Sequence, residues 1–371
     1  MVTDTKAWFT ISNVEELDSP SLVIYEDRLD QNLDWMIQTA GGSQRLIPHM
    51  KTHKMAEVLK KLLKRGITKI KCATLAEAEL AAREGMNEIV VAHALVGPKK
   101  KRFFQLVEKF PDVAWSTLVD HLDELNAWKR EIEHTRRTVS LYVDVNVGMN
   151  RSGHVVNEEL KRLVELLLAE PGIQFMGFHV YDGHVRSTEF KDRQHQIESG
   201  IAPFYAFLEA NSWSHHRIIA GGSPAFTVHA LAPDRLCSPG TGVFWDSGYG
   251  NALPEQGFRP AALVLARVIS KPAPGIVTLD AGHKSMSSEN PITQRMTWLN
   301  APTDYTWKSQ SEEHGVLEVE DDRLYHIGDV LYGLPYHICP TVNLYDEAYV
   351  IRANRAEEIW QIEGRKRKLT V

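Results

Sequence analysis

Short runs of apolar and β-branched residues alternate with longer amphipathic segments from about Ser21 onward. In 54–66 and 75–85, apolar residues recur every three or four positions and a glycine follows, as at the C-terminus of a helix. The runs between such segments predict eight strands, at 21–27, 45–50, 69–74, 88–93, 114–119, 140–146, 174–180 and 216–222. Eight strand and helix repeats are typical of a (β/α)₈ TIM-type barrel, an α/β fold whose chemistry lies at the C-terminal ends of its strands.

After about Thr241 this rhythm changes to short strands separated by turns, with few helical stretches. The pattern predicts a second, mostly β domain. We therefore expect a barrel over 20–245 and a β domain formed by 1–19 and 246–371. The segment before Ser21 is too short to fold alone, so we expect it to pack on the β domain.

Composition limits the partners and the compartment. The formal net charge of −6 over 371 residues provides no basic field for nucleic acid or an anionic membrane, which favours a small-molecule partner. Three widely spaced cysteines do not form a disulfide framework and suit a reducing compartment. With no signal-peptide pattern and no apolar run long enough for a membrane span, we expect a cytoplasmic protein.

The segment PHMKTHK places Lys51 directly after an apolar strand, where a barrel presents catalytic groups. A lysine that forms a Schiff base needs a partly desolvated site, because the neutral amine must attack an aldehyde. His49, His53 and Lys54 are near enough in sequence to contribute to such a site. The residues alone leave a solvated surface lysine equally open.

Two further segments carry polar groups past strand ends. In VDVNVGMNRSG a glycine-containing turn leads to Arg151, whose guanidinium can bind an oxygen anion, although a surface arginine in a flexible turn is as plausible. In FHVYDGH, Tyr181 and His184 follow a strand. The Tyr181 ring is suited to lie against a flat cofactor, but the residue alone favours a half-buried core aromatic.

Two glycine-rich turns, AGGSPAF at 220–226 and SPGTGVFWD at 238–246, each follow a predicted strand. Glycines such as Gly222 and Gly240 let backbone N–H groups approach an oxyanion, and Ser223 and Thr241 add hydroxyl donors. One such turn is usually an ordinary turn. Two at adjacent strand ends indicate a phosphate site.

The segment PYHICPTVN carries His337 and Cys339 two positions apart. On an extended segment both side chains point to one face and can bind one metal with positions left open for water or substrate. Thiolate with imidazole favours Zn²⁺, with Mn²⁺ or Mg²⁺ as alternatives. An isolated His-x-Cys pair is more often incidental. The segments 280–289 and 312–319 add charged and imidazole groups to the same domain.

The order of the motifs resembles the D-threonine aldolase and D-serine dehydratase family of fold-type III enzymes, which use pyridoxal 5′-phosphate (PLP) and share the alanine racemase barrel. The segments that carry this resemblance are, in order, PHMKTHK, VDVNVGMNRSG, YDGH, GGSPAF, PGTGVFWD, DAGHK, EEHG and PYHICPTVN. The resemblance runs from about Ser21 to the end of the chain. It implies that Lys51 holds the PLP aldehyde, Arg151 bonds the ring oxygen or the substrate side, and Tyr181 stacks on the ring. It also implies a phosphate site at Gly222, Ser223, Gly240 and Thr241, a metal at His337 and Cys339, and a homodimer.

The resemblance implies a metal-dependent lyase for 3-hydroxy D-amino acids and leaves two branches open. Aldolase cleavage yields glycine and an aldehyde, whereas dehydration yields a 2-oxo acid and ammonia. The His-x-Cys pair is similar to the dehydratase version, since the aldolase version is His-x-Asp. His184 is the candidate base of the aldolase branch, but its spacing from Tyr181 is not the family's. A non-catalytic PLP-binding protein is a further alternative, although such small proteins lack the β domain and the metal pair.

Overall fold

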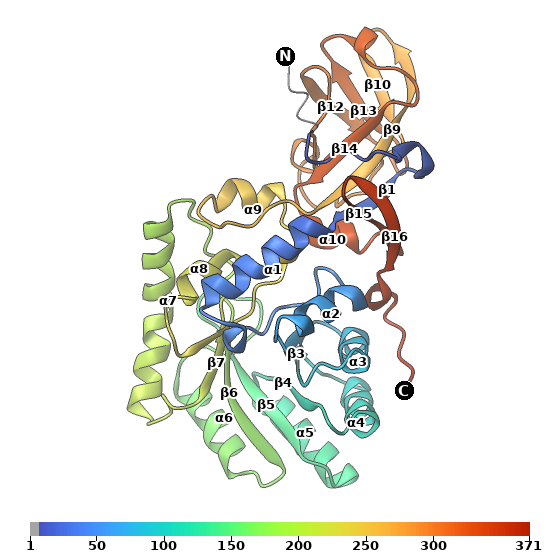
Figure 1. Ribbon diagram of the computed structural model, residues 1–371. Coiled ribbons are helices and arrows are strands. Elements are labelled where there is room, and N and C mark those ends of the chain that lie inside the picture. Colours follow the sequence, from blue (N-terminus) through green and yellow to red (C-terminus); the bar gives the residue numbers. More distant parts are fainter. Residues whose placement is uncertain (1–6) are drawn as a thin grey trace. The chain divides into compact units, whose positions relative to one another are not determined.

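The computed structural model describes residues 7–371, which form two compact units (Figure 1). One unit contains the described residues up to Asp34 together with 241–363, and the other contains 35–240 together with 364–371. The first six residues of the N-terminal segment predicted to join the β domain lie outside the described part of the chain.

The unit of residues 35–240 is built on a parallel sheet of seven strands in sequence order. These strands are β2 (Lys69–Cys72), β3 (Glu88–Ala94), β4 (Ala114–Val119), β5 (Val139–Val145), β6 (Ile173–Val180), β7 (Arg217–Ala220) and β8 (Arg235–Cys237). Helices alternate with them along the chain, one before each strand: α2 (Ala56–Lys64), α3 (Leu75–Arg83), α4 (Lys99–Lys109), α5 (Leu122–Thr135), α6 (Glu158–Ala169), α7 (Phe190–Ala210) and α8 (Phe226–His229). The two helices predicted most directly, in 54–66 and 75–85, are confirmed, and Gly66 and Gly85 follow them with positive φ.

The segment 46–50 joins the two edges of this sheet. Leu46 forms a parallel bridge to Cys237 of β8, and His49 forms one to Lys71 of β2. The Ile47 N–H donates to the Cys237 carbonyl at 2.9 Å, and the Met50 N–H donates to the Lys71 carbonyl at the same distance. Seven strands and this segment therefore close into a barrel, which confirms the predicted TIM-type fold.

The first strand predicted for the barrel lies in the other unit instead. β1 (Ser21–Tyr25) pairs antiparallel with β9 (Ala262–Ala273) and parallel with β15 (Glu347–Arg352). The barrel position is taken by β8, whose three residues are too few to give a hydrophobic pattern. Leu22, Val23 and Ile24 are fully buried, and a strand buried on both faces has the same apolar run in either sheet.

The other unit is a nine-stranded sheet, which confirms the mostly β second domain. Its main path is β12-β13-β10-β9-β1-β15-β16, and β14 pairs with both β9 and β11. The remaining strands are β10 (Ile276–Leu279), β11 (Met296–Trp298), β12 (Tyr305–Gln310), β13 (Gly315–Val319), β14 (Val330–Pro335) and β16 (Arg355–Gln361). Its short helices are α9 (Ser247–Ala252) and α10 (Ile338–Val342), while α1 (Glu26–Ala40) begins in this unit and ends in the barrel unit.

The segment before β1 packs on this sheet. Ile11 and Leu17 join a buried cluster with Val23, Leu263 and Tyr332. The Ile11 N–H also donates to the Tyr332 hydroxyl at 3.2 Å. These contacts explain why so short a segment is ordered, as expected from the sequence.

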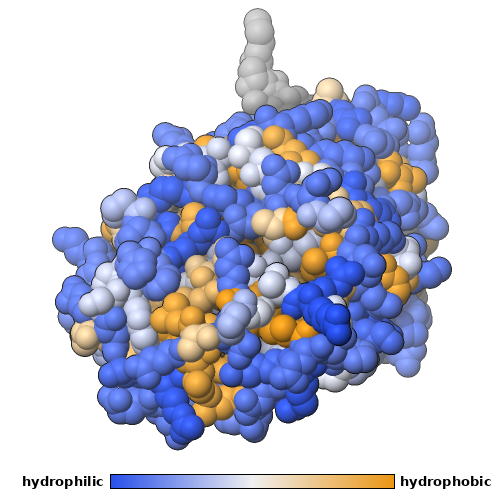
Figure 2. Space-filling model, turned by 90° about the horizontal axis from the view of Figure 1, so that it is seen from below, coloured by the Kyte–Doolittle hydropathy of each residue, from blue (hydrophilic) through white to orange (hydrophobic). Residues whose placement is uncertain are grey.

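Within the described residues, none of the helices has the length and apolar character needed to span a bilayer. The face in Figure 2 is mainly hydrophilic, with apolar side chains gathered near its middle.

Candidate active site

A cavity of about 450 Å³ opens in the barrel unit at the C-terminal ends of β2 to β5. Its lining combines apolar strand ends with polar groups, of which the polar ones are His49, Lys51, His93, Asp120, Asp144, Arg151 and Ser152. Catalytic groups of such barrels come from these strand ends. The cavity brings Lys51 and Arg151 together, two residues that the sequence predicted from separate motifs.

Lys51 lies in the turn that follows the barrel-closing segment, and its side chain is partly exposed to the cavity. Its backbone N–H donates to His49 Nδ1 at 3.3 Å, while His53 Nδ1 accepts from the Met55 N–H at 3.1 Å. Burial lowers the pKa of His53 to about 3 and, helped by the Lys51 charge, lowers the pKa of His49 well below its usual value. Both rings are therefore neutral. Lys54 forms an ion pair with Glu77, which occupies its ammonium group.

Arg151 is held by a turn rather than by a regular element. Asn146 Oδ1 accepts from the Gly148 and Asn150 N–H groups at 3.0 and 3.1 Å, and this pins the turn after β5. The guanidinium carbon of Arg151 lies 4.6 Å from the Tyr181 ring centroid, a cation–π geometry. The Tyr181 ring follows β6, so the structure brings the second and third predicted motifs together.

His184 is exposed and does not line the cavity. A Cβ added to Gly148 would lie 3.0 Å from His184 Nε2, so this ring lies against the turn that carries Arg151. The positive φ of 117° at Gly148 also requires a residue without a side chain there.

The glycine-rich turns meet beside the Lys51 turn. The Gly240 N–H donates to Ser223 Oγ at 3.1 Å, which joins the turn after β7 to the turn after β8. A Cβ on Gly240 would lie 2.9 Å from the His49 carbonyl oxygen, and a Cβ on Gly222 would lie 2.6 Å from the Tyr181 ring. Both glycines are therefore needed for close approach of backbone. Thr241 is the first residue of the β unit, and its Oγ1 lies 3.3 Å from Cys339 Sγ.

A chain of buried polar groups beneath the cavity was missed at the level of sequence. Asp144 accepts from Ser152 Oγ at 2.9 Å and binds His179 Nδ1 at 2.6 Å. His179 Nε2 lies 3.3 Å from Lys71 Nζ, which donates to Ser238 Oγ at 2.6 Å. Burial lowers the pKa of Lys71 to about 7 and also lowers that of His179. The available signal was a lysine and a histidine inside the otherwise apolar runs KIKCAT and QFMGFHV.

In the β unit, His337 and Cys339 are in contact, but not on an extended segment as predicted. His337 is the extended N-cap of α10, and Cys339 lies in the first turn of that helix. The helix begins here because the Ile338 N–H donates to Asp246 Oδ2 at 3.0 Å. A hydrogen bond between the two side chains still forms, so the pair survives the change in backbone conformation.

This pair favours charged forms. Burial alone lowers the pKa of His337, but its hydrogen bond to Cys339 and the Glu289 carboxylate bound to Nδ1 raise it to about 9. Burial alone raises the pKa of Cys339, and the bond to His337 overcomes this and lowers it. Thiolate and imidazole suit a soft divalent ion. Among residues 7–371 no three His, Cys, Asp or Glu side chains gather as a metal site.

The segments 280–289 and 312–319 contact each other on the surface of the β unit. The Lys284 N–H donates to the Glu312 carbonyl at 3.1 Å. Lys284 forms ion pairs with Glu312 and Glu313, and all three side chains are more than half exposed. Such exposed pairs stabilise little.

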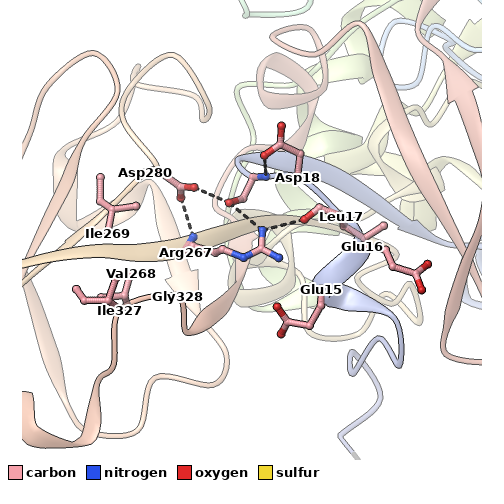
Figure 3. A pocket seen from close by; sticks show the side chains of 11 residues that line it. Glu15, Glu16, Leu17, Asp18, Arg267, Val268, Ile269, Asp280, Ile327 and Gly328 are labelled. Atoms are coloured by element: carbon pink, nitrogen blue, oxygen red, sulfur yellow. Dashed lines mark hydrogen bonds between the residues drawn. The ribbon is translucent and has the colours of Figure 1, made fainter.

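A larger hollow of about 630 Å³ lies in the β unit (Figure 3). The Arg267 guanidinium there donates to the carbonyl oxygens of Val14 and Leu17 at 3.0 and 2.9 Å and to Ser19 Oγ at 3.1 Å. The arginine thus ties the N-terminal segment to β9. Its donors are taken by structural contacts, so size does not make this hollow the candidate site.

Known families match most of the chain. The family model of the alanine racemase N-terminal domain matches residues 24–247, and a serine dehydratase domain model matches 261–351. A D-threonine aldolase of Arthrobacter sp. is 30% identical over 361 residues, covering 94% of this chain and 93% of that protein. A 3-hydroxy-D-aspartate aldolase of Paracoccus denitrificans is 25% identical, covering 94% and 92%.

A solved structure agrees over almost the full length. The D-threonine aldolase from Filomicrobium marinum superposes with a TM-score of 0.85 at 25% identity, covering 97% of this chain and 98% of that one. The match extends over both sheets, so it supports the assignment of the two units to one known architecture.

Proposed function

The chain belongs to the fold-type III family of PLP-dependent enzymes, with lyases as its relatives, and on that basis we propose that it cleaves 3-hydroxy D-amino acids to glycine and an aldehyde. The observation that carries the proposal is the cavity in which Lys51 and Arg151 meet, with Gly240 packed against His49 of its lining. The D configuration rests on the aldolases to which the chain is similar.

The barrel residues suit PLP. The Gly222 and Gly240 backbone, with the Ser223 and Thr241 hydroxyls, would hold the phosphate, since the bond from the Gly240 N–H to Ser223 Oγ joins the two glycine turns. Lys51 would bind the aldehyde, the Tyr181 ring would lie against the cofactor ring, and Arg151 would pair with an oxygen anion. Bound PLP supplies an electron sink for a bond broken at Cα.

His337 and Cys339 would hold the divalent metal, for which Zn²⁺ is favoured and Mn²⁺ or Mg²⁺ are alternatives. Two protein ligands leave coordination positions for water and substrate, and the bound ion would polarise the β-hydroxyl. The Glu289 carboxylate on His337 Nδ1 leaves Nε2 as the ligand nitrogen.

The proton transfers are assigned to side chains of the barrel unit. Lys51 would deliver a proton to Cα after the Cα–Cβ bond breaks, because its amine lies at the cavity. His184 would take the hydroxyl proton. Its ring lies against Gly148 in the turn that carries Arg151, and this proximity supports the assignment.

D-serine dehydratase activity is the second candidate. The match of residues 261–351 to a serine dehydratase domain favours it, and so does cysteine as the second residue of the metal pair. In that branch Lys51 would remove the Cα proton and hydroxide would leave, giving a 2-oxo acid and ammonia.

A product assay separates the candidates. Purified protein with PLP is incubated with D-threonine, D-serine and their L-isomers, with and without added Zn²⁺ or Mn²⁺. The aldolase proposal expects glycine and acetaldehyde from D-threonine, and a preference over the L-isomer of several kcal/mol because the wrong isomer loses contacts in the transition state. A 2-oxo acid from D-serine without any glycine from D-threonine would favour the dehydratase. Equal rates for both isomers would contradict both.

A further inference from the structure

Lys71 is an unusual residue for a barrel interior. It is only 3% exposed, and it lies on β2 between the buried residues Ile70 and Cys72. Alternate residues of a barrel strand point into the barrel, and a lysine there must be paired with polar groups or be neutral. Its partners are Ser238 Oγ and His179 Nε2.

Ser238 and the Lys71 backbone connect this residue to both ends of the proposed cofactor site. Ser238 lies two residues before Gly240, and its N–H donates to the Gly221 carbonyl at 3.1 Å. On the other side, the Lys71 backbone bonds to both Pro48 and Met50, next to Lys51. Lys71 is thus joined by its backbone to the segment before Lys51 and by its ammonium to the turn that leads to Gly240.

We propose that Lys71 is a positioning residue that sets the electrostatic environment of the bound cofactor ring, acting through Ser238. The proposal rests on PLP binding at Lys51, and it adds a role for a residue outside the predicted site. Lys71 is a buried lysine whose ammonium donates directly to Ser238, the residue that follows β8.

The charge on Lys71 depends on pH near neutrality. Burial and, to a smaller extent, the Lys51 charge lower its pKa to about 7, although Asp144 opposes them and raises it. When His179 is neutral, its Nδ1 donates to Asp144, and its Nε2 then accepts from Lys71 Nζ whether the lysine is charged or neutral. The groups around Lys71 are Lys51, Asp144, Arg151, Asp182, His179 and His49. Lys71 gains its positive charge as the pH falls through about 7.

A nearby positive charge disfavours protonation of the cofactor chromophore. Replacing the lysine by methionine removes that charge while keeping the length of the side chain. In Lys71→Met holoenzyme, the pH midpoint of the visible spectrum should move upward by roughly one to three units, the range that a charge within about 4–6 Å produces. Ser238→Ala should shift the midpoint in the same direction by less.

Lys100→Met is the matched control. Lys100 is also buried and has a pKa lowered by burial, but it lies on α4 and donates to the Leu95 carbonyl. Its substitution should leave the spectral midpoint unchanged.

The experiment is an absorbance titration of the four holoenzymes from pH 5.5 to about 9, with circular dichroism to verify folding, over the window set by these pKa values. Unchanged midpoints in both Lys71→Met and Ser238→Ala, or an equal shift in Lys100→Met, would overturn the proposal. If Lys71→Met does not fold, Ser238→Ala alone decides. A wild-type protein without any visible band in added PLP would overturn the proposed function together with this inference.

Discussion

The pKa values of buried histidines shift in opposite directions in the two units. In the barrel unit, burial lowers the pKa values of His49, His53 and His179, and Lys71 is lowered with them. In the β unit, the pKa of His337 rises to about 9 beside a thiol whose own pKa falls. The barrel therefore favours the neutral forms of these histidines, whereas the β unit favours the protonated form of His337 and the ionised form of Cys339.

The contrast follows from the partners and not from burial alone. His179 is bonded to Asp144, which by itself raises its pKa, but burial and the charge on Lys71 outweigh that carboxylate. His337 faces Cys339 and Glu289, and these acceptors outweigh its burial. Neutral bases suit proton transfer, and a thiolate with imidazole suits metal binding.

The largest expected effect comes from removing the side-chain amine of Lys51. Lys51→Ala should lower kcat/KM by about 10⁴-fold, or about 5.4 kcal/mol, because the covalent role of the lysine has no substitute. The measurement is steady-state cleavage of D-threonine. Lys60→Ala, which changes an exposed lysine of α2, is the control and should keep wild-type kinetics.

The buried barrel histidines should make the protein sensitive to acid. Burial lowers the folded-state pKa of His53 from 6.5 to about 3, so its stabilising contribution is complete above pH 6.5 and is lost as the pH falls toward 3. Between pH 6.5 and pH 4 this one group should account for about 3 kcal/mol of lost unfolding free energy.

Urea unfolding at the two pH values tests this expectation. His53→Asn keeps an acceptor for the Met55 N–H and should lose less stability in acid than wild type does. His121→Asn, at an exposed position, should behave as wild type. An equal acid loss in all three proteins would show that His53 is not the source.

The His337 and Cys339 pair of the β unit should be needed for turnover but not for the binding of the cofactor. Cys339→Ala should lower kcat by about 100-fold, or about 2.7 kcal/mol, because Lewis-acid assistance is lost while the barrel is unchanged. Its visible spectrum should match that of wild type, and EDTA should have the same effect on wild type. Cys72→Ala, at a buried thiol of β2, is the comparison. Full activity of Cys339→Ala in metal-free buffer would contradict a metal role.

The smallest effect is expected from the carboxylate behind His337. Glu289→Ala should weaken Zn²⁺ binding by roughly tenfold, since such partners orient the ligand ring. Competition with a chromophoric chelator measures this affinity. Glu312→Ala, which removes an exposed pair with Lys284, should leave it unchanged.

The sequence predicted the architecture better than the membership of single strands. Repeated strand and helix patterns identified the barrel, because apolar periodicity is set by burial within each element. The same information assigned β1 to the wrong sheet, since Leu22, Val23 and Ile24 are buried in either arrangement. β8 escaped notice because it has only three residues and is held by backbone pairing to β7 and to the segment 46–50.

The residues of the candidate site also differ in how far the sequence could predict them. Residues in turns, such as Arg151 and Gly240, could be found from motifs because a turn concentrates polar and glycine residues. The chain from Asp144 through His179 to Lys71 could not, because its members come from three strands and meet only in the closed barrel. The extended conformation expected at Cys339 failed because Asp246, about 90 residues earlier, caps α10.

The central claim is that Lys51, and not the buried low-pKa Lys71, carries the cofactor. Reducing the holoenzyme with borohydride fixes PLP on its lysine, and mass spectrometry of a protease digest then locates the label. The account predicts the pyridoxyl group on the peptide that contains Lys51, with Lys71 unmodified. A label on Lys71, or on any lysine outside the cavity, would contradict it.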